Sequence, residues 1–390
     1  MKKFPTGLVK PFVTHPALTH KLLRGAYRKY VNANLDIRRD TGESRALWLL
    51  SLRITDKCNH RCAVCGQYGE GGYNREGSGL PEVRGNVPME RYIEMMDNVE
   101  HLKPHIYITG GEPFLYDGLM DLCTYIKKKY LSLQVVTNGV KLERCAERIV
   151  KDRWDMICVS LDGPQEIHDR CRGVKGAFRT TARGLEAINR EKARQKTDLP
   201  LVFLLTTLSS NNYDTLYQTV VEAQKFSPDC VVIYYSWFTS QEVGEKHRDI
   251  IKGSFGVEPF AWKSYVRDNS GADFDSLRKA VDRVKNERWE KPVVFVPNLD
   301  GDDLERYYMD PTDFMGWKKC RTPWVEANIM PNGDVVTCRD FPDLVMGNIM
   351  DEPLLDIYNN EKFKEFRKTL AHQLDGVFPL CSRCCGLMGF

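Results

Sequence analysis

Three cysteines stand close together in the segment DKCNHRCAVCGQYG, at positions 58, 62 and 65, and no fourth cysteine follows nearby. Zinc sites normally take four protein ligands, or three and a water, and His60 lies between Cys58 and Cys62, where a short loop has difficulty in aiming four ligands at one ion. A redox pair formed by Cys62 and Cys65 explains neither Cys58 nor the later cysteines. A 4Fe–4S cluster fits better, because three thiolates leave one iron open to a small-molecule ligand.

A second group of cysteines lies near the C-terminus. Cys320 and Cys338 flank Gly333, and a C-x-x-C pair follows at Cys381 and Cys384. Four thiolates are enough for a structural zinc ion or for a fully ligated iron–sulfur cluster. Cys385 adjoins the pair, so either of the last two cysteines can serve as the fourth ligand, and we favour Cys384.

The other cysteines argue for a reducing compartment. The total of thirteen is odd and the chain of 390 residues is long, whereas disulfide scaffolds belong to short secreted chains. Five cysteines stand singly, and we interpret them as small buried hydrophobic side chains: Cys123, Cys145, Cys158, Cys171 and Cys230. No secretory signal or 20-residue apolar span is recognisable, which predicts a cytoplasmic protein.

Strand-like and helix-like segments alternate from residue 48 onward. The apolar, β-branched runs lie at 47–55, 105–109, 133–137, 155–161, 201–207 and 230–235, and segments of helical character lie at 88–101, 116–130, 141–152, 165–193 and 212–226. This alternation predicts an α/β fold with parallel strands and right-handed crossovers. Six units are fewer than a closed barrel needs, so we expect a partial (β/α)6 barrel, with ligands beyond the carboxyl ends of its strands.

The chain divides into four predicted parts: a basic helical extension (1–47), the partial barrel (48–240), a connecting region (241–319) and a small C-terminal domain (320–390). Residues 325–338 predict a β-hairpin with its turn at Asn332-Gly333, and a helix is expected over roughly 352–371. The connecting region has helical character at 273–289 and a strand-like run at 292–296.

The first part is basic, with ten Lys and Arg against three Asp and Glu in residues 1–47, although the net charge of +3 excludes no partner. A helical wheel places Leu22, Tyr27 and their apolar neighbours opposite Lys21, Arg24, Arg28 and Lys29. We expect this helix to dock on its own domain with a solvated basic face. Contact with an anionic membrane surface or an anionic substrate is the alternative, and no nucleic-acid partner is expected.

The strand ends strengthen the cluster hypothesis. The C-x-x-x-C-x-x-C motif after the first strand resembles that of the radical S-adenosylmethionine enzymes, and Val64 departs from it, because an aromatic residue commonly precedes the third cysteine. YITGGEP (107–113), VTNG (136–139) and VSLDGP (159–164) end the next three strands and resemble further motifs of the family. The resemblance implies that Cys58, Cys62 and Cys65 hold a 4Fe–4S cluster and that S-adenosylmethionine binds near Gly110, Gly111, Glu112, Asn138, Ser160, Asp162 and Arg172. Taken singly, Gly-Gly is also an ordinary turn, and Ser160 or Asp162 an ordinary helix cap.

The C-terminal cysteines are similar to those of the twitch extension, a shortened SPASM domain. That resemblance implies an auxiliary 4Fe–4S cluster held by Cys320, Cys338, Cys381 and Cys384. The cluster either accepts an electron from the substrate or only fixes the C-terminal domain to the barrel. An electron donor such as flavodoxin or ferredoxin is implied as well.

The resemblance thus implies a radical S-adenosylmethionine oxidoreductase that removes a hydrogen atom from an unidentified small molecule or peptide. The alternatives are a peptide maturase and a non-catalytic electron carrier or binding protein. The glycine-rich segment 66–88 is either a linker or a lid over the site, and no catalytic acid or base is recognisable.

Overall fold

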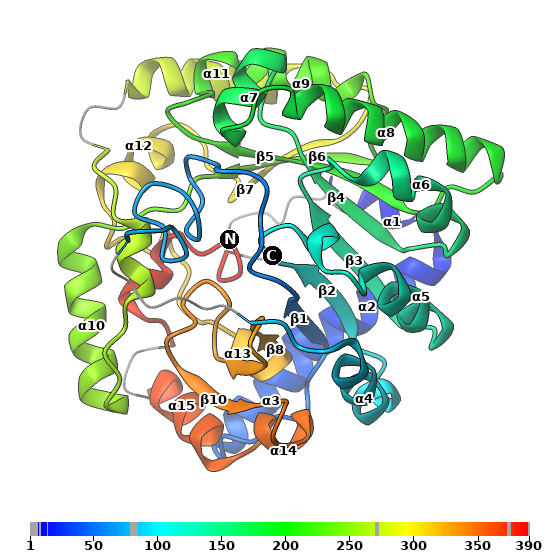
Figure 1. Cartoon of the computed structure of the whole chain (residues 1–390). Helices are drawn as coiled ribbons and strands as arrows, with labels where there is room; N and C mark the ends of the chain where they lie inside the picture. The colour runs from blue at the N-terminus through cyan, green and yellow to red at the C-terminus, as the bar shows by residue number, and fades with distance from the viewer. Residues whose placement is uncertain are drawn as a thin grey trace.

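The computed structural model describes residues 7, 9–13, 15–78, 85–269, 273–372 and 376–388. Their strands form one sheet in the order β10-β9-β8-β1-β2-β3-β4-β5-β6-β7. Strands β1 to β7 pair in parallel with their neighbours along the chain, and the far edge of β1 pairs in parallel with β8. The strands curve around a common centre with helices outside (Figure 1), which confirms the predicted partial barrel with its C-terminal addition.

The strands have these bounds: β1 (Leu49–Arg53), β2 (His105–Thr109), β3 (Ser132–Thr137), β4 (Met156–Ser160), β5 (Leu201–Leu208), β6 (Cys230–Tyr235), β7 (Val293–Val296), β8 (Glu326–Ile329), β9 (Asp334–Val336) and β10 (Val345–Asn348). Alternation along each strand separates two environments. Leu50 and Leu52 of β1 belong to the main core with the surrounding helices. Ser51 and Arg53, on the opposite face, point into the barrel.

The covering helices are α4 (Met89–Val99), α5 (Leu119–Lys128), α6 (Leu142–Lys151), α7 (Gln165–Arg172), α8 (Ala177–Arg194), α9 (Leu216–Gln224), α10 (Gln241–Phe255), α11 (Phe274–Asn286) and α12 (Asp302–Met309). The segment of helical character predicted over 165–193 is divided into two helices, α7 and α8. The chain breaks between α7 and α8, where Gly173 and Gly176 have φ angles of +66° and +86° that end one helix and precede the next.

The C-terminal segment extends the barrel sheet. The predicted hairpin is present as β8 and β9, with Gly333 at φ +91° in its turn, and β10 continues it. A short helix α13 (Thr322–Val325) leads into β8. The one helix expected over 352–371 is instead α14 (Leu354–Tyr358) and α15 (Glu361–His372), because the side chain of Asn360 accepts the N–H of Phe363 and starts a new helix.

The region expected to connect the two parts contributes to the barrel itself. Its strand-like run forms β7, which pairs with β6 and ends the sheet. The domain boundaries drawn from the sequence stay predictions.

The basic N-terminal part forms α1 (Lys10–Val13), α2 (Pro16–Tyr27), a π-helical segment η2 (Arg28–Asn32) and α3 (Ala33–Arg39). It docks on its own domain as expected, but the prediction of a solvated basic face is wrong. Lys21 Nζ lies 2.6 Å from Asp155 Oδ1, and Arg28 Nη1 donates to the carbonyl oxygen of Leu47 at 2.7 Å. Leu23 and Tyr27 are instead 63% and 58% exposed. Internal acceptors therefore decide which face turns inward.

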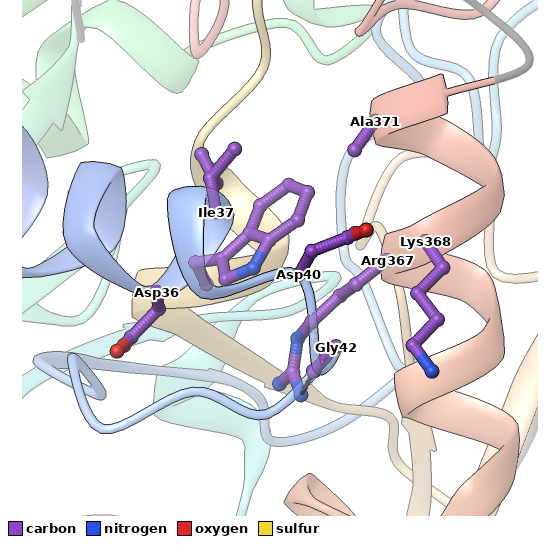
Figure 2. A pocket seen from close by; sticks show the side chains of 8 residues that line it. Asp36, Ile37, Asp40, Gly42, Arg367, Lys368 and Ala371 are labelled. Carbon is purple, nitrogen blue, oxygen red and sulfur yellow. Dashed lines mark hydrogen bonds between the residues drawn. The ribbon is translucent and has the colours of Figure 1, made fainter.

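The end of α3 lies against α15 around a small pocket (Figure 2), lined by Asp36, Ile37, Asp40, Gly42, Trp324, Arg367, Lys368 and Ala371. Arg367 is fully buried there. Its guanidinium donates to the carbonyl oxygens of Pro323, Gly42 and Tyr358 at 2.8, 3.0 and 2.8 Å, and so joins the N-terminal turn to the C-terminal helices. No described helix has both the length and the apolar character that a bilayer crossing requires.

Candidate functional site

The loop after β1 carries Cys58, Cys62 and Cys65, all half-buried. The backbone N–H two residues after Cys58 lies 3.4 Å from its sulfur, and the N–H two residues after Cys65 lies at the same distance from that sulfur. Arg172 Nη1 lies 3.6 Å from the sulfur of Cys62. A set of three sulfurs, each with an N–H donor, fits thiolate ligands of an iron–sulfur cluster, whose potential such hydrogen bonds tune.

The segment Gly110–Glu112 packs its backbone against the residues that lead into this loop. The N–H groups of Gly111 and Glu112 donate to the carbonyl oxygens of Thr55 and Lys57, each at 2.8 Å. A Cβ on Gly110 would lie 2.7 Å from the Thr55 oxygen, and one on Gly111 2.3 Å from the Lys57 oxygen. The two glycines therefore permit a close approach of the protein's own backbone, while their contact with a ligand stays a prediction.

Glu112 and Asn138 meet beside the cysteine loop. The carboxylate of Glu112 accepts the hydroxyl of Thr137 at 2.6 Å and the N–H of Asn138 at 2.7 Å. Burial raises the pKa of Glu112, and these two donors oppose that shift. The Asn138 amide donates in turn to Asn59 Oδ1, within the cysteine loop, at 2.7 Å. Two predicted cofactor-binding residues are thus brought to one side of the loop.

Asp162 and Arg172 meet at the other side. Arg172 Nη2 lies 2.7 Å from Asp162 Oδ2, and both side chains are largely buried. Burial opposes the charge of Arg172, but Asp162 and Cys62 outweigh it and raise the pKa of the guanidinium. Arg172 therefore lies between a carboxylate and a cysteine sulfur. Ser160 ends β4 on the interior face, and α7 begins only after Pro164, so neither Ser160 nor Asp162 caps that helix.

The second cysteine group is assembled from three separate parts of the chain. Burial raises the pKa of Cys384, and the thiols of Cys385, Cys381, Cys338 and Cys320 raise it further. Cys384 therefore lies within electrostatic range of the other three predicted auxiliary ligands.

Cys385 faces a different environment. Its side chain packs against the apolar cluster inside the barrel, which contains Cys158 and Phe203. Burial raises the pKa of Cys385 to about 11, with a further contribution from Asp340. This difference supports the prediction that Cys384, rather than Cys385, is the fourth ligand.

Within the described ranges, no three His, Cys, Asp or Glu side chains are close enough together to hold a single metal ion.

Sequence reasoning missed a polar group on the barrel wall between the two cysteine groups. Arg339, the residue after Cys338, places Nη1 3.2 Å from Ser51 Oγ and 3.3 Å from Glu326 Oε1. Its guanidinium also lies 4.7 Å from the ring centre of Tyr107. The alternation of polar residues with leucine in β1 could have indicated polar side chains inside the barrel. The pairing of β1 with β8, which brings Glu326 to the same wall, could not be predicted from the sequence.

Comparison with protein families gives two matches. Residues 52–219 match the radical SAM superfamily, and residues 320–385 match the SPASM family, described as an iron–sulfur cluster-binding domain. The two matches cover the first and the second cysteine group respectively.

Two curated relatives illustrate the range of similar proteins. The chain is 23% identical over 316 residues to the antilisterial bacteriocin subtilosin biosynthesis protein AlbA of Bacillus subtilis. This match covers 80% of this chain and 59% of AlbA. It is 27% identical over 165 residues to Fe-coproporphyrin III synthase of Methanosarcina barkeri, covering 38% of each. The chain thus spans less than two thirds of these relatives' length.

Among solved structures, Streptococcus suis SuiB bound to S-adenosylmethionine superposes with a TM-score of 0.57 at 15% identity, covering 82% of this chain and 68% of SuiB. SuiB bound to its precursor peptide SuiA gives a TM-score of 0.56 at 14% identity, covering 85% and 69%. At such identities the likeness shows a shared fold.

Proposed function

We propose that this chain, a radical S-adenosylmethionine protein with a C-terminal SPASM domain, is an oxidoreductase that removes a hydrogen atom from a peptide. Its two domains bring a 4Fe–4S cluster that binds S-adenosylmethionine, and an auxiliary iron–sulfur site. Cys58, Cys62 and Cys65 would hold the first cluster, which would supply the electron for reductive cleavage of S-adenosylmethionine to methionine and a 5′-deoxyadenosyl radical, the species that would take a hydrogen atom from the substrate. The observation that carries the proposal is the meeting of Glu112, Asn138, Asp162 and Arg172 around the three-cysteine loop.

The residues around the loop have separate tasks in this proposal. Glu112, fixed by Thr137 and the backbone of Asn138, presents its carboxylate with the backbone of Gly110 and Gly111 to the methionyl ammonium group. Asn138 beside Glu112, and Ser160, Asp162 and Arg172 on the other side of the loop, orient the ribose and the methionyl carboxylate. Arg172 also holds Cys62 in place through its contact with the sulfur.

The C-terminal cysteines supply the electron acceptor in this proposal. A substrate that has lost a hydrogen atom completes a two-electron oxidation when it gives one further electron to a fixed acceptor and a proton to solvent. We assign the acceptor to one auxiliary cluster at Cys320, Cys338, Cys381 and Cys384. The gathering of these four side chains supports the assignment.

A peptide substrate is supported by the similarity to AlbA, a bacteriocin biosynthesis protein, and to SuiB, which binds a precursor peptide. A small molecule is the second candidate, supported by the shorter match to Fe-coproporphyrin III synthase. The electron donor is a small one-electron carrier of the flavodoxin or ferredoxin type, and we place the protein in the cytoplasm, where thiols stay reduced.

The exposed side chains of Leu23 and Tyr27 support contact with a membrane surface as a further proposed property. Co-sedimentation with phosphatidylglycerol vesicles tests it. Binding should fall when both residues become serine, and equal binding by that variant would contradict the contact.

The function is tested with the full chain, reconstituted with iron and sulfide without oxygen and supplied with S-adenosylmethionine and dithionite. We expect 5′-deoxyadenosine to form and roughly eight irons per chain, as two four-iron clusters require. An electron carrier would hold iron and form no 5′-deoxyadenosine, and that result would contradict the enzyme proposal. Transfer of deuterium from a labelled peptide into 5′-deoxyadenosine would identify the substrate position.

A further inference from the structure

Two buried side chains on the inner wall of the barrel have polar atoms without a partner among the described residues. Arg53 is 2% exposed, and although Nη1 donates to the hydroxyl of Tyr73, its Nε and Nη2 are unpaired. Asn328 is 1% exposed, and both its Oδ1 and its Nδ2 are unpaired. A buried polar group without a partner destabilises the fold, so two such groups at neighbouring positions indicate a ligand.

The two side chains lie on adjacent strands and on the same face. In the β1–β8 pair, Ser51 is opposite Asn328, and Arg53 is two residues further along β1. Successive residues of a strand alternate between its faces, so Ser51, Arg53 and Asn328 all face the interior. Arg53 and Asn328 can therefore reach the same bound molecule.

This part of the barrel lies between the two cysteine groups. Tyr73, whose hydroxyl accepts from Arg53, donates its backbone N–H to the carbonyl oxygen of Gly66, the residue after Cys65 of the first group, at 3.2 Å. Ser51, two residues before Arg53 and on the same face, accepts from Nη1 of Arg339, the residue after Cys338 of the second group, at 3.2 Å. A molecule held by Arg53 is thus close to both proposed cluster sites.

The pattern of unpaired atoms defines the chemistry of the ligand. The free Nε and Nη2 of Arg53 form one edge of the guanidinium, where two parallel N–H groups match the two oxygens of a carboxylate. No carboxylate of the described residues forms an ion pair with Arg53, whereas the nearby Glu326 is paired with Arg339. The free amide of Asn328 can donate to the carbonyl and accept from the N–H of a peptide bond.

We propose that Arg53 and Asn328 form a substrate subsite in which Arg53 binds a carboxylate of the peptide and Asn328 binds an adjacent peptide bond. This inference rests on the proposed peptide substrate and assigns its chemical class. The carboxylate belongs either to an Asp or Glu side chain or to the C-terminus of the peptide. Both present the same two oxygens to Arg53.

Three N-acetylated tripeptides distinguish these sources: trialanine with a free carboxylate, trialanine amide, and Ala-Glu-Ala amide. Their binding to the reconstituted full chain with S-adenosylmethionine is measured by ligand-observed NMR. At least one carboxylate peptide should bind about tenfold or more tightly than trialanine amide, as a charge-assisted hydrogen bond predicts. Equal binding of all three peptides would overturn the proposal.

Variants locate the preference. Arg53→Gln should remove the carboxylate preference, and Arg53→Lys, which keeps the charge but not the parallel edge, should leave only part of it. Asn328→Ala should weaken all three peptides while the preference persists. Arg183→Gln, at an exposed arginine of α8, is the matched control and should bind like the unchanged chain. Circular dichroism shows whether each variant is folded. If Arg53→Gln does not fold, the partial loss of carboxylate preference in Arg53→Lys tests the proposal.

Two outcomes separate this inference from its rivals. If Arg53→Gln weakens S-adenosylmethionine binding by the same factor as peptide binding, the pair belongs to the cofactor site and the proposal is wrong. If the unchanged chain shows the carboxylate preference but forms no 5′-deoxyadenosine, the subsite stands and the proposed function fails.

Discussion

The two cysteine groups are built in opposite ways. Cys58, Cys62 and Cys65 lie on one short loop, half-buried, at the carboxyl end of β1. Cys320, Cys338 and the pair at Cys381 and Cys384 come together only when the last seventy residues close on the barrel edge at β8. The first group therefore depends on local geometry and on contacts from neighbouring strand ends, whereas the second depends on the tertiary fold.

The N-terminal extension strengthens this contrast, because a described residue of it, Lys29, lies near the second group. Lys29 of η2 lies within electrostatic range of Cys320, Glu326 and Cys384. Arg367 of α15 joins the turn after α3 to the residues that precede β8. Substitutions should therefore separate loss of the proposed chemistry at the first group from loss of folding and of the proposed electron transfer at the second.

The largest effect is expected at the first group. Replacing Cys62 with alanine removes one of the three proposed cluster ligands, so 5′-deoxyadenosine formation should become undetectable and iron should fall from roughly eight to roughly four per chain. High-performance liquid chromatography and an iron assay measure the two quantities. Because the loop is local, the thermal midpoint should hardly change. A substantial fall in that midpoint would show that the first group is structural as well.

The second group should give the reverse pattern. Cys338→Ser should remove roughly four irons and lower the thermal midpoint, because metal binding stabilises the closure of the C-terminal segment. Formation of 5′-deoxyadenosine without substrate should continue. Cys385→Ser is the matched control and should keep roughly eight irons, since Cys385 faces the barrel interior. Iron loss from Cys385→Ser with retention in Cys384→Ser would reverse the ligand assignment.

The same contrast explains how far sequence reasoning reached. The parallel strands and the three-cysteine loop were predicted because apolar periodicity and the cysteine spacing are local signals. The pairing of Leu49 with Glu326, which places Arg53 and Asn328 on one wall, joins distant parts of the chain and leaves no local signal. The orientation of α2 was missed for another reason. A helical wheel shows that two faces differ, but only the acceptors on the barrel, such as Asp155, decide that the basic face turns inward.

A smaller effect is expected where the first group depends on neighbouring strand ends. Arg172→Gln leaves the carboxylate of Asp162 buried without its partner, which should lower the free energy of unfolding by about 3–5 kcal/mol. Denaturant unfolding of the reconstituted chain measures it. The double variant Asp162→Asn with Arg172→Gln removes both charges and should lose less stability than Arg172→Gln alone. A larger loss in the double variant would mean that the ion pair itself contributes little.

The smallest effect is expected from Lys29, and it tests whether the N-terminal extension acts on the second group alone. A positive charge near Cys320 and Cys384 favours the reduced, more negative form of a cluster held there, so Lys29→Met should lower the reduction potential of the auxiliary cluster. A redox titration followed by electron paramagnetic resonance measures both clusters in one sample. Lys151→Met, at an exposed residue of α6, is the control and should shift neither potential.

Lys29 comes near the second cysteine group because the N-terminal extension docks on the barrel. We therefore expect the reduction potential of the auxiliary cluster to shift and that of the first cluster to stay the same. Equal shifts of both signals would mean that the charge acts on the whole barrel, and that the two cysteine groups are not electrostatically separate.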